Sequence, residues 1–444
     1  MSAPDMTGAA ALGRSGSRRI VVVGGGIAGL EVATRLGQRL GRPGRAEVVL
    51  VDNETAHVWK PMLRAVAAGT SDSHREQLPY VVQASRNGFS YWPGTLAGQD
   101  RGRKVLRLAS LPGPDGRDIL GAREIGYDVL VPAVGSRAND YGTSGIAEHC
   151  HLIDSRAQAD VFNWAARAEM LRSLAENREM GIAIVGGGSA TGIDLAAELM
   201  HLLEAAATYG AGDMRARARL TLIESGPRLL TPFPERSQEA ATRRLSALGV
   251  EIRCNARVSE AREDGFRLQD GGSVPASLRV RAAGVRGSGV PSELDGLDTN
   301  RNHQLLVGTT LQTTGDPAVF ALGDCASLMP PGEERPLPAT AQVAHQQAQH
   351  LIRHLPDWLE GRPMQPLAYR DLGSLVSLGP YGAYGSLGDV GLFRAGFVRG
   401  RLAQAGHVLL RRSHQARLHG VWRGTLIWLV DRLAGLVAPR IRVD

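Results

Sequence analysis

The stretch Val-Val-Gly-Gly-Gly-Ile-Ala-Gly at residues 22–29 decides the fold of this chain. Its glycines Gly24, Gly26 and Gly29 have the spacing GxGxxG, and they follow the apolar run 20–23, which predicts a strand. Such a turn joins a strand to a helix whose N-terminal N–H groups and dipole favour a pyrophosphate. The stretch therefore predicts a dinucleotide-binding fold, with an ordinary tight turn as the alternative.

An acid closes the next predicted strand. The apolar run 48–51 is followed by Asp52, whose carboxylate can accept hydrogen bonds from an adenosine ribose. Asp52 lies further from Gly24 than the usual separation of about 20 residues. We therefore expect a slightly long helix between the glycine turn and this strand.

A second glycine turn, Ile-Val-Gly-Gly-Gly-Ser-Ala-Thr-Gly, occupies residues 184–192. Gly186, Gly188 and Gly192 are spaced GxGxxxG, one residue more than the fingerprint. The extra residue is expected within 189–191, where it would alter the grip on phosphate.

The strand predicted after this turn also ends in an acid. The apolar run 220–223 is closed by Glu224, and a carboxylate there binds a free ribose 2′-hydroxyl and repels a 2′-phosphate. Glu224 therefore favours NADH over NADPH, with a charged residue that merely ends a strand as the alternative. Two turns in one chain predict two bound nucleotides, FAD and a nicotinamide.

Length and composition indicate a large enzyme. A chain of 444 residues is longer than a single hydrophobic core usually supports, so two or three domains are expected. The net charge of +7 comes almost entirely from arginine, because Lys60 and Lys104 are the only lysines. No nucleic-acid module is present in the sequence, so nucleic-acid binding is not expected. Residues 1–17 lack the apolar core of a signal peptide and are expected to be a disordered lead-in.

The three cysteines Cys150, Cys254 and Cys325 are far apart in the sequence. They cannot form the adjacent dithiol that some flavoenzymes reduce internally, so electrons should leave for a separate acceptor. We expect ordinary thiols, and the sequence predicts no metal site.

The C-terminal tail has apolar residues at helical spacing, and the charged residues that flank them are arginines. Its longest apolar run, 426–430, is much shorter than the ~20 residues that span a bilayer. An interfacial helix on an anionic lipid surface fits better, with a core-facing or dimer-forming helix as the alternative. The apolar positions are Trp422, Leu426, Leu429, Leu433 and Leu436, and the flanking cations are Arg417, Arg423 and Arg432.

Segments between these motifs identify a family. They are Trp59-Lys60-Pro61, Tyr127-Asp128 before Ala133-Val134-Gly135-Ser136, Leu311-Gln312-Thr313-Thr314, Ala321-Leu322-Gly323-Asp324-Cys325-Ala326, Gly373-Ser374-Leu375-Val376-Ser377-Leu378 and His414-Gln415. From about Arg18 to its C-terminus the chain resembles the type II NADH dehydrogenases.

The resemblance implies an α/β fold of two nested Rossmann-like dinucleotide-binding domains and a C-terminal amphipathic membrane-binding segment. The FAD-binding domain would comprise residues 18–150 and 300–365, and the NADH-binding domain residues 151–299. Residues 366–444 would form the membrane-association region.

The resemblance also implies roles for single residues. Gly24, Gly26, Gly29 and Asp52 would hold the ADP half of FAD, Asp324 its ribityl chain, and Gly135 would also contact FAD. Gly186, Gly188, Gly192, Glu224 and Gly284 would bind NADH. Ala341, Gln342 and Gln346 would line the quinone pocket, and the two glutamines, spaced i and i+4, share a helix face. Lys60 would lie beside the flavin, where a compact ammonium can stabilise reduced flavin.

The activity implied is oxidation of NADH with electron transfer to a membrane quinone in a respiratory chain, without proton pumping. The enzyme would be peripheral on the cytoplasmic face of the inner membrane. A low-turnover FAD- and NADH-binding sensor, or a related flavoprotein reductase with another acceptor, remains open. The sequence names neither the quinone nor the oligomeric state, which could be a homodimer.

Three departures from the family pattern concern the catalytic region. Asp194 replaces the usual glutamate, Arg64-Ala65 replaces a His-Glu pair, and Arg281 replaces a tryptophan. Because Asp194 has the shorter side chain, we expect it to reach less far and NADH affinity or turnover to be lower.

Overall fold

The structure is a computed structural model that describes residues 17–437 except 72–76, 114, 140–141, 209–211, 213, 283, 290–293 and 389–396. The chain forms two compact units, each assembled from three stretches of sequence. The first unit comprises Met1–His57, Gln77–Arg137 and Val285–Tyr369, and the second comprises Val58–Glu76, Ala138–Gly284 and Arg370–Asp444.

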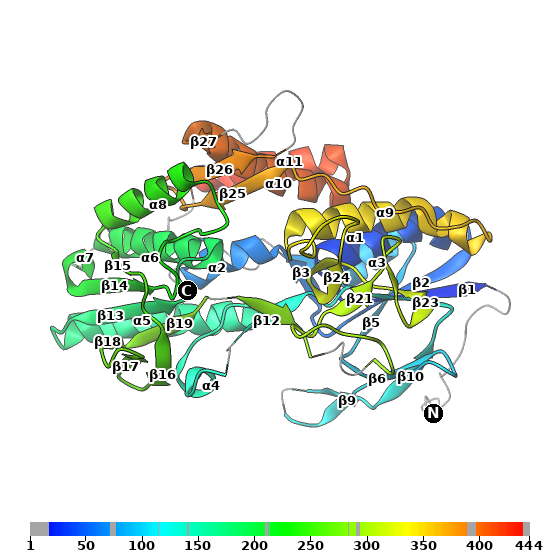
Figure 1. Cartoon of the computed structure of the whole chain (residues 1–444), viewed down its shortest axis with the longest axis horizontal. Coiled ribbons are helices and arrows are strands. Elements are labelled where there is room, and N and C mark those ends of the chain that lie inside the picture. The colour runs from blue at the N-terminus through cyan, green and yellow to red at the C-terminus, as the bar shows by residue number, and fades with distance from the viewer. Residues whose placement is uncertain are drawn as a thin grey trace. The chain divides into compact units, whose positions relative to one another are not determined.

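The first unit is built on an eight-stranded sheet in which β1 lies between β11 and β2 (Figure 1). β1 pairs in parallel with β2 and β11, so that Ile20 lies between Val48 and Val129. These central strands are apolar and almost fully buried, as expected for parallel strands covered on both faces. The sheet order is β24 (Ala326–Leu328), β21 (Leu305–Val307), β22 (Gln312–Thr313), β23 (Asp316–Phe320), β11 (Val129–Pro132), β1 (Arg18–Val23), β2 (Ala46–Asp52) and β5 (Ser90–Pro93).

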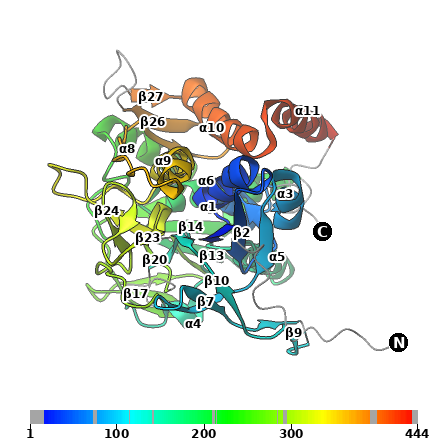
Figure 2. The same ribbon diagram turned by 90° about the vertical axis from the view of Figure 1, so that its right-hand side faces the viewer.

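Helices α1 (Ile27–Leu36) and α9 (Ala341–Leu359) of this unit lie side by side (Figures 1 and 2). A π-helical turn, η1 (Gly37–Gly41), continues α1 and accounts for the long separation between Gly24 and Asp52. The remaining elements of this unit, some at its edges, are α3 (Tyr80–Asn87), η4 (Gly323–Cys325), β3 (Ala56–Val58), β4 (Gln77–Pro79), β6 (Leu96–Asp100), β7 (Val105–Leu108), β8 (Leu111–Pro112), β9 (Asp118–Leu120), β10 (Arg123–Gly126), β12 (Ser136–Ala138) and β20 (Val285–Gly287).

The second unit has a four-stranded parallel sheet in the order β15 (Glu251–Arg253), β14 (Ala218–Ile223), β13 (Met180–Val185) and β19 (Leu278–Arg281). Apolar side chains from this sheet and from its helices form the main core of the unit. Its other elements up to residue 284 are η2 (Lys60–Met62), α2 (Leu63–Ala67), α4 (Ile146–His149), α5 (Arg156–Ala175), α6 (Ala190–Thr208), α7 (Met214–Arg217), α8 (Glu235–Ala247), β16 (Val258–Arg262), β17 (Gly265–Leu268) and β18 (Ser273–Pro275).

The C-terminal part of this unit is a three-stranded antiparallel sheet followed by two helices. The strands are β25 (Gly373–Ser377), β26 (Ala383–Leu387) and β27 (Phe397–Arg399). Helices α10 (Arg401–His419) and α11 (Val421–Val437) pack against each other (Figure 2). None of the helices within the described residues has the length and apolar character needed to cross a membrane.

The strands predicted from the apolar runs 20–23, 48–51 and 220–223 are confirmed as β1, β2 and β14, and the tail helix as α11. The unit boundaries, near residues 137, 284 and 369, differ from the predicted ones at 150, 299 and 365. Residues 370–444 group with the second unit instead of standing apart. Most of the predicted lead-in, residues 1–16, lies outside the described residues.

Candidate functional site

The first glycine turn lets α1 approach β1 very closely. A Cβ atom on Gly29 would lie 1.9 Å from the carbonyl oxygen of Gly24, which no side chain can occupy. Gly24 continues the sheet, because its N–H donates to Val51 O at 2.8 Å. Gly26 is the N-cap residue of α1 and has no side chain to compete for the free N–H groups of that helix.

Asp52 ends β2 beside this turn. Its carboxylate accepts hydrogen bonds from the N–H of Gly25 and from the N–H of Glu54, the latter at 2.7 Å. Burial raises the pKa of Asp52, and these two hydrogen bonds oppose the rise. Tyr80 Oη donates to Gly25 O at 2.9 Å and so fixes the turn from its other side.

The Gly-Asp-Cys turn is held by side chains from distant segments of the same unit. Ser136 Oγ donates to Asp324 Oδ2 at 2.7 Å, next to Gly135. The N–H of Gly323 donates to Gln347 Oε1 of α9 at 2.7 Å. Cys325 is fully buried, and burial raises the pKa of its thiol to about 11, so a reactive thiolate is disfavoured.

Ala341 begins α9, and Gln342 and Gln346 lie half-buried one turn apart on it, so the predicted helix is confirmed. Gln342 Nε2 donates to Tyr369 Oη at 2.7 Å. Between the two glutamines, His345 Nδ1 lies 2.7 Å from Glu31 Oε2, and Glu31 is buried on α1. The Glu31 carboxylate therefore ties α9 to the helix of the first glycine turn.

There is open space beside Gly26 and Gly135 in the first unit. No described atom lies within 4 Å of the position that a Cβ would take on Gly26 or on Gly135. The N-terminus of α1 points its N–H groups into this space, with Asp52 beside it. These residues fit the ADP half of FAD.

The second turn keeps the spacing of the first, but in a different register from the predicted one and with a serine at the middle position. A Cβ on Gly192 would lie 2.6 Å from Cα of Gly187, the contact that Gly29 makes with Gly24. Gly187 and Gly192 thus correspond to Gly24 and Gly29, and Ser189 takes the place of Gly26. The expectation of an extra residue within 189–191 is wrong, because the insertion is at Gly186, where the N–H groups of Gly186 and Gly187 both donate to Ile223 O.

Ser189 changes the start of α6. Its Oγ accepts a hydrogen bond from the N–H of Gly192 at 3.1 Å and donates to Ala282 O at 3.0 Å. One N–H of the first helical turn is therefore already paired, whereas Gly26 in the first turn offers no such partner.

Glu224 occupies the position that Asp52 has in the first unit. Its carboxylate accepts hydrogen bonds from the N–H of Gly188 at 3.0 Å and of Gly226 at 2.8 Å. A Cβ on Gly188 would lie 2.4 Å from Glu224 Oε2, so only glycine allows this contact. The matching pairs Gly25–Asp52 and Gly188–Glu224 support the corrected register.

Asp194 is paired with an arginine of the same unit. Arg64 Nε lies 2.6 Å from Asp194 Oδ2, and their side chains are 18% and 10% exposed. Arg64 lies on α2, immediately after the η2 turn that begins at Lys60. Two departures from the family pattern, at positions 64 and 194, therefore form one ion pair.

Glu198 follows Asp194 by one helical turn, and Thr70 Oγ donates to its Oε2. Burial, with a smaller contribution from the charge of Asp194, raises the pKa of Glu198 from 4.5 to about 7. Thr70 and Arg64 act in the opposite direction. Nothing in the sequence alone marked Glu198 as unusual.

We expect Glu198→Gln to change how stability depends on pH. Between pH 4.5 and about 7 the native protein holds a proton on Glu198 that the unfolded chain has lost, so stability falls as pH rises through this window. Glutamine cannot ionise, so the variant should gain about 3 kcal/mol relative to the parent between pH 4.5 and pH 8. Thermal unfolding across this range measures the difference. An unchanged pH dependence would show that Glu198 titrates normally.

The other predicted residues of the second unit lie at the end of its sheet. Arg281 ends β19, is buried, and donates from Nε to Asn139 O at 3.2 Å. Gly284 is exposed, and its carbonyl accepts the N–H of Asn139 at 3.2 Å. Cys150 and Cys254 are both free thiols whose pKa burial raises.

Comparisons with known proteins agree with this geometry. Residues 18–348 match the family model described as pyridine nucleotide-disulphide oxidoreductase. The chain is 38% identical to the type II NADH:quinone oxidoreductase of Haemophilus influenzae, over 96% of this chain and 100% of that protein. The chain belongs to the type II NADH:quinone oxidoreductases. A member from Staphylococcus aureus (strain NCTC 8325 / PS 47) is 28% identical, over 82% of this chain and 88% of that protein.

Solved structures show that type II NADH:quinone oxidoreductases and this chain share a fold. NDH2 from Plasmodium falciparum in complex with NADH aligns with a TM-score of 0.82 at 15% identity, over 96% of this chain and 100% of that one. The sulfide:quinone oxidoreductase of Aquifex aeolicus aligns with a TM-score of 0.71 at 16% identity, over 96% and 98% of the two chains. The α/β architecture is therefore common to enzymes with different electron donors.

The predicted site residues are divided between the two units. The first unit contains Gly24, Gly26, Gly29, Asp52, Gly135, Asp324, Ala341, Gln342 and Gln346, and the second unit contains Lys60, Gly186, Gly188, Gly192, Asp194, Glu224 and Gly284. Sequence reasoning missed Tyr80, Ser136 and Gln347, because their contacts join segments far apart in the chain. Arg64 and Asp194 did carry a signal, since both depart from the family pattern with opposite charge.

Proposed function

We propose that the second unit binds NADH, that the first unit holds FAD, and that the electrons go to a membrane quinone without proton pumping. FAD, when bound, accepts a hydride from NADH and passes the two electrons on to the quinone. The observation that carries the proposal is the pair of glycine turns, each with its own acid, in a member of this family. A respiratory chain is the setting in which such a reaction is useful.

In the first unit, two groups of residues take part in FAD binding. The turn at Gly24, Gly26 and Gly29 and the N-terminus of α1 hold the pyrophosphate, and Asp52 accepts from the adenosine ribose. Gly135 leaves room for the cofactor. Asp324, which is oriented by its hydrogen bond from Ser136, accepts hydrogen bonds from the ribityl hydroxyls of FAD. Lys60 provides a positive charge that stabilises the reduced, anionic flavin.

NADH binding rests on the second turn. Gly187 joins the predicted Gly186, Gly188 and Gly192 around the pyrophosphate, and Glu224 accepts from the free ribose hydroxyls. Gly284 lines the nicotinamide end of the site. Asp194 also lies at the nicotinamide end of the site, and its carboxylate is oriented by the ion pair with Arg64.

Quinone binding is assigned to the start of α9. Ala341 leaves space for a flat ring, and the amides of Gln342 and Gln346 donate to its carbonyl oxygens. The contact between His345 and Glu31 fixes the rotation of α9, so the two amides stay on one side.

A spectroscopic titration tests the proposal. Under anaerobic conditions NADH should bleach the flavin absorbance of the purified protein, NADPH should bleach it little because Glu224 repels the 2′-phosphate, and a short-chain quinone should restore it. Flavin that stays oxidised while NADH is bound would contradict the proposed oxidoreductase activity. It would support a nucleotide-binding sensor instead. Bleaching without recovery would point to another acceptor.

The tail is the proposed membrane contact, on the cytoplasmic face. Exposed apolar side chains of α10 and α11 are Val408, Leu409, Leu410, Trp422, Leu426, Trp428, Leu429, Val430 and Leu433, with Arg423 exposed beside them. The side chains of Arg432 and Leu436 lie outside the described part of the structure. Such a surface suits an anionic lipid interface.

We expect Leu429→Glu/Leu433→Glu to weaken binding to phosphatidylglycerol vesicles at least tenfold, because each buried leucine contributes about 1.5–3 kcal/mol. Vesicle co-sedimentation measures the loss. Leu171→Glu, on α5 and 67% exposed, is the matched control and should bind like the parent. Equal loss in both variants would exclude a specific tail contact, and a change in mass by light scattering would indicate a dimer-forming tail instead.

A further inference from the structure

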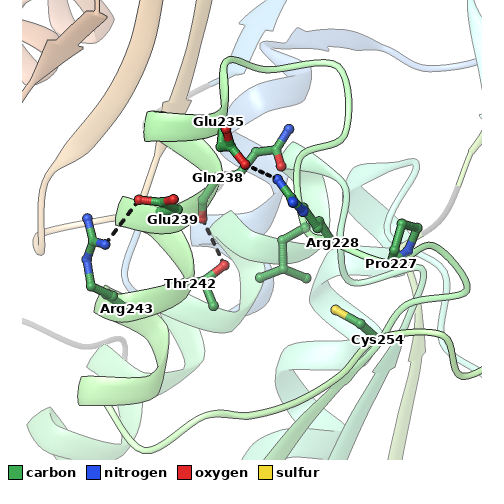
Figure 3. Close-up of a pocket in the computed structure, with 9 residues that line it drawn as sticks. Pro227, Arg228, Glu235, Gln238, Glu239, Thr242, Arg243 and Cys254 are labelled. Carbon is green, nitrogen blue, oxygen red and sulfur yellow. Dashed lines mark hydrogen bonds and ion pairs between the residues drawn. The ribbon is translucent and has the colours of Figure 1, made fainter.

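A cavity of about 330 Å³ lies in the second unit between the loop after β14 and the first turns of α8 (Figure 3). Its walls carry two ion pairs, Arg228 with Glu235 and Arg243 with Glu239. The remaining wall residues are Pro227, Leu229, Gln238, Thr242 and Cys254. The proposed function gives this cavity no role.

The cavity adjoins Glu224. The backbone of residues 254–256 runs beside residues 224–226, with Asn255 N donating to Gly226 O and Ala256 N to Glu224 O, both at 2.9 Å. Burial and then the charge of Glu224 raise the pKa of Cys254, a cavity wall residue. The segment that pairs with residues 224–226 therefore contributes Cys254 to the wall of this cavity.

Arg228 lies on a loop that begins and ends at the second glycine turn. At the start of the loop, Glu224 Oε2 accepts the N–H of Gly188 at 3.0 Å. At its end, the N–H of Leu230 donates to the carbonyl of the same Gly188 at 2.7 Å. Arg228 is thus held at the ribose side of the phosphate-binding turn.

The Arg228 guanidinium forms an ion pair with Glu235. Arg228 Nη1 is hydrogen-bonded to Glu235 Oε1, in the first turn of α8 (Figure 3). A 2′-phosphate carries a charge of about −1.5 to −2, and arginine is the side chain best suited to bind it. While Arg228 pairs with Glu235, that phosphate would meet Glu224 without a compensating cation.

We propose that Glu235 is a specificity-determining residue that keeps Arg228 from binding the 2′-phosphate of NADPH. The inference rests on the proposed function, in which Glu224 receives the adenosine ribose of the dinucleotide. Two carboxylates then exclude NADPH, Glu224 by direct repulsion and Glu235 by holding the arginine.

The test compares kcat/KM and nucleotide affinity for NADH and NADPH in Glu224→Ala and in Glu224→Ala/Glu235→Gln. Because the Arg228–Glu235 pair is exposed, we expect the second substitution to raise the NADPH to NADH ratio a further ~3–5-fold. Adding Arg228→Ala should cancel this gain. Glu239→Gln in the Glu224→Ala background is the control, because Glu239 pairs with Arg243 in the same cavity wall.

The possible results distinguish failure of the role of Glu235 from failure of the proposed function. A gain that disappears with Arg228→Ala and is absent with Glu239→Gln supports the inference. A ratio that Glu235→Gln moves no more than Glu239→Gln, or a gain that persists without Arg228, overturns it while NADH oxidation stands. A parent protein that binds neither nucleotide overturns both.

Discussion

Gly29→Ala is expected to abolish the folded FAD-binding unit. The added Cβ would lie 1.9 Å from a backbone oxygen, so α1 would have to move away from β1, whose residues 20–22 are fully buried. A loss of about 4 kcal/mol or more is expected from such a clash in a core. The variant should be insoluble or unfolded by circular dichroism and should carry no flavin absorbance.

Gly26→Ala is the matched variant with the opposite outcome for stability. Its Cβ would meet no described atom within 4 Å, so the unfolding temperature should stay close to that of the parent. The methyl group would instead occupy the space through which a pyrophosphate approaches the backbone, and flavin content should fall at least tenfold. A Gly26→Ala protein with full flavin would contradict the assignment of the first turn, and a stable, flavin-loaded Gly29→Ala protein would contradict the helix contact.

Breaking the Arg64–Asp194 pair is expected to have the next largest effect. Both side chains are largely buried, so Arg64→Ala leaves a carboxylate, and Asp194→Ala a guanidinium, without its counter-charge. Each single variant should lose about 2–4 kcal/mol of stability, near the lower end of the values for fully buried pairs. Removing both charges should cost less than the sum of the two single losses.

Urea unfolding of the four proteins in this cycle measures the coupling. Arg243→Ala, which removes an exposed pair with Glu239, is the control and should lose at most about 0.5 kcal/mol. NADH turnover should fall in both single variants, because Asp194 is assigned to the nicotinamide end. Strictly additive losses would mean that Arg64 and Asp194 do not depend on each other.

The sequence predicted those parts of the molecule that depend on neighbouring residues. A strand, a glycine turn and a closing acid are local patterns, and the structure does place Asp52 at the end of β2 and Glu224 directly after β14. The C-terminal helix could also be predicted, because the spacing of its apolar residues is a property of a single segment.

Sequence reasoning failed where three glycines in a row made the register ambiguous, and where partners lie far apart. Nothing in the run 186–188 indicates which glycine meets the helix, since that depends on the backbone of β14. Arg64 and Asp194 are separated by 130 residues, and Ser136 and Asp324 by 188. Such pairs appear only when the units have formed.

The division of each unit among three stretches also bears on synthesis at the ribosome. All four strands of the β15-β14-β13-β19 sheet have been made by Arg281, so this sheet can form while translation continues. The eight-stranded sheet begins at Arg18 but cannot be completed before β24 ends at Leu328. Until β23 has been made, up to Phe320, β11, whose Leu130 pairs with Val319, presents an unpaired apolar edge. During that interval the edge is open to pairing with other chains, although β1 and β2 are among the earliest elements made.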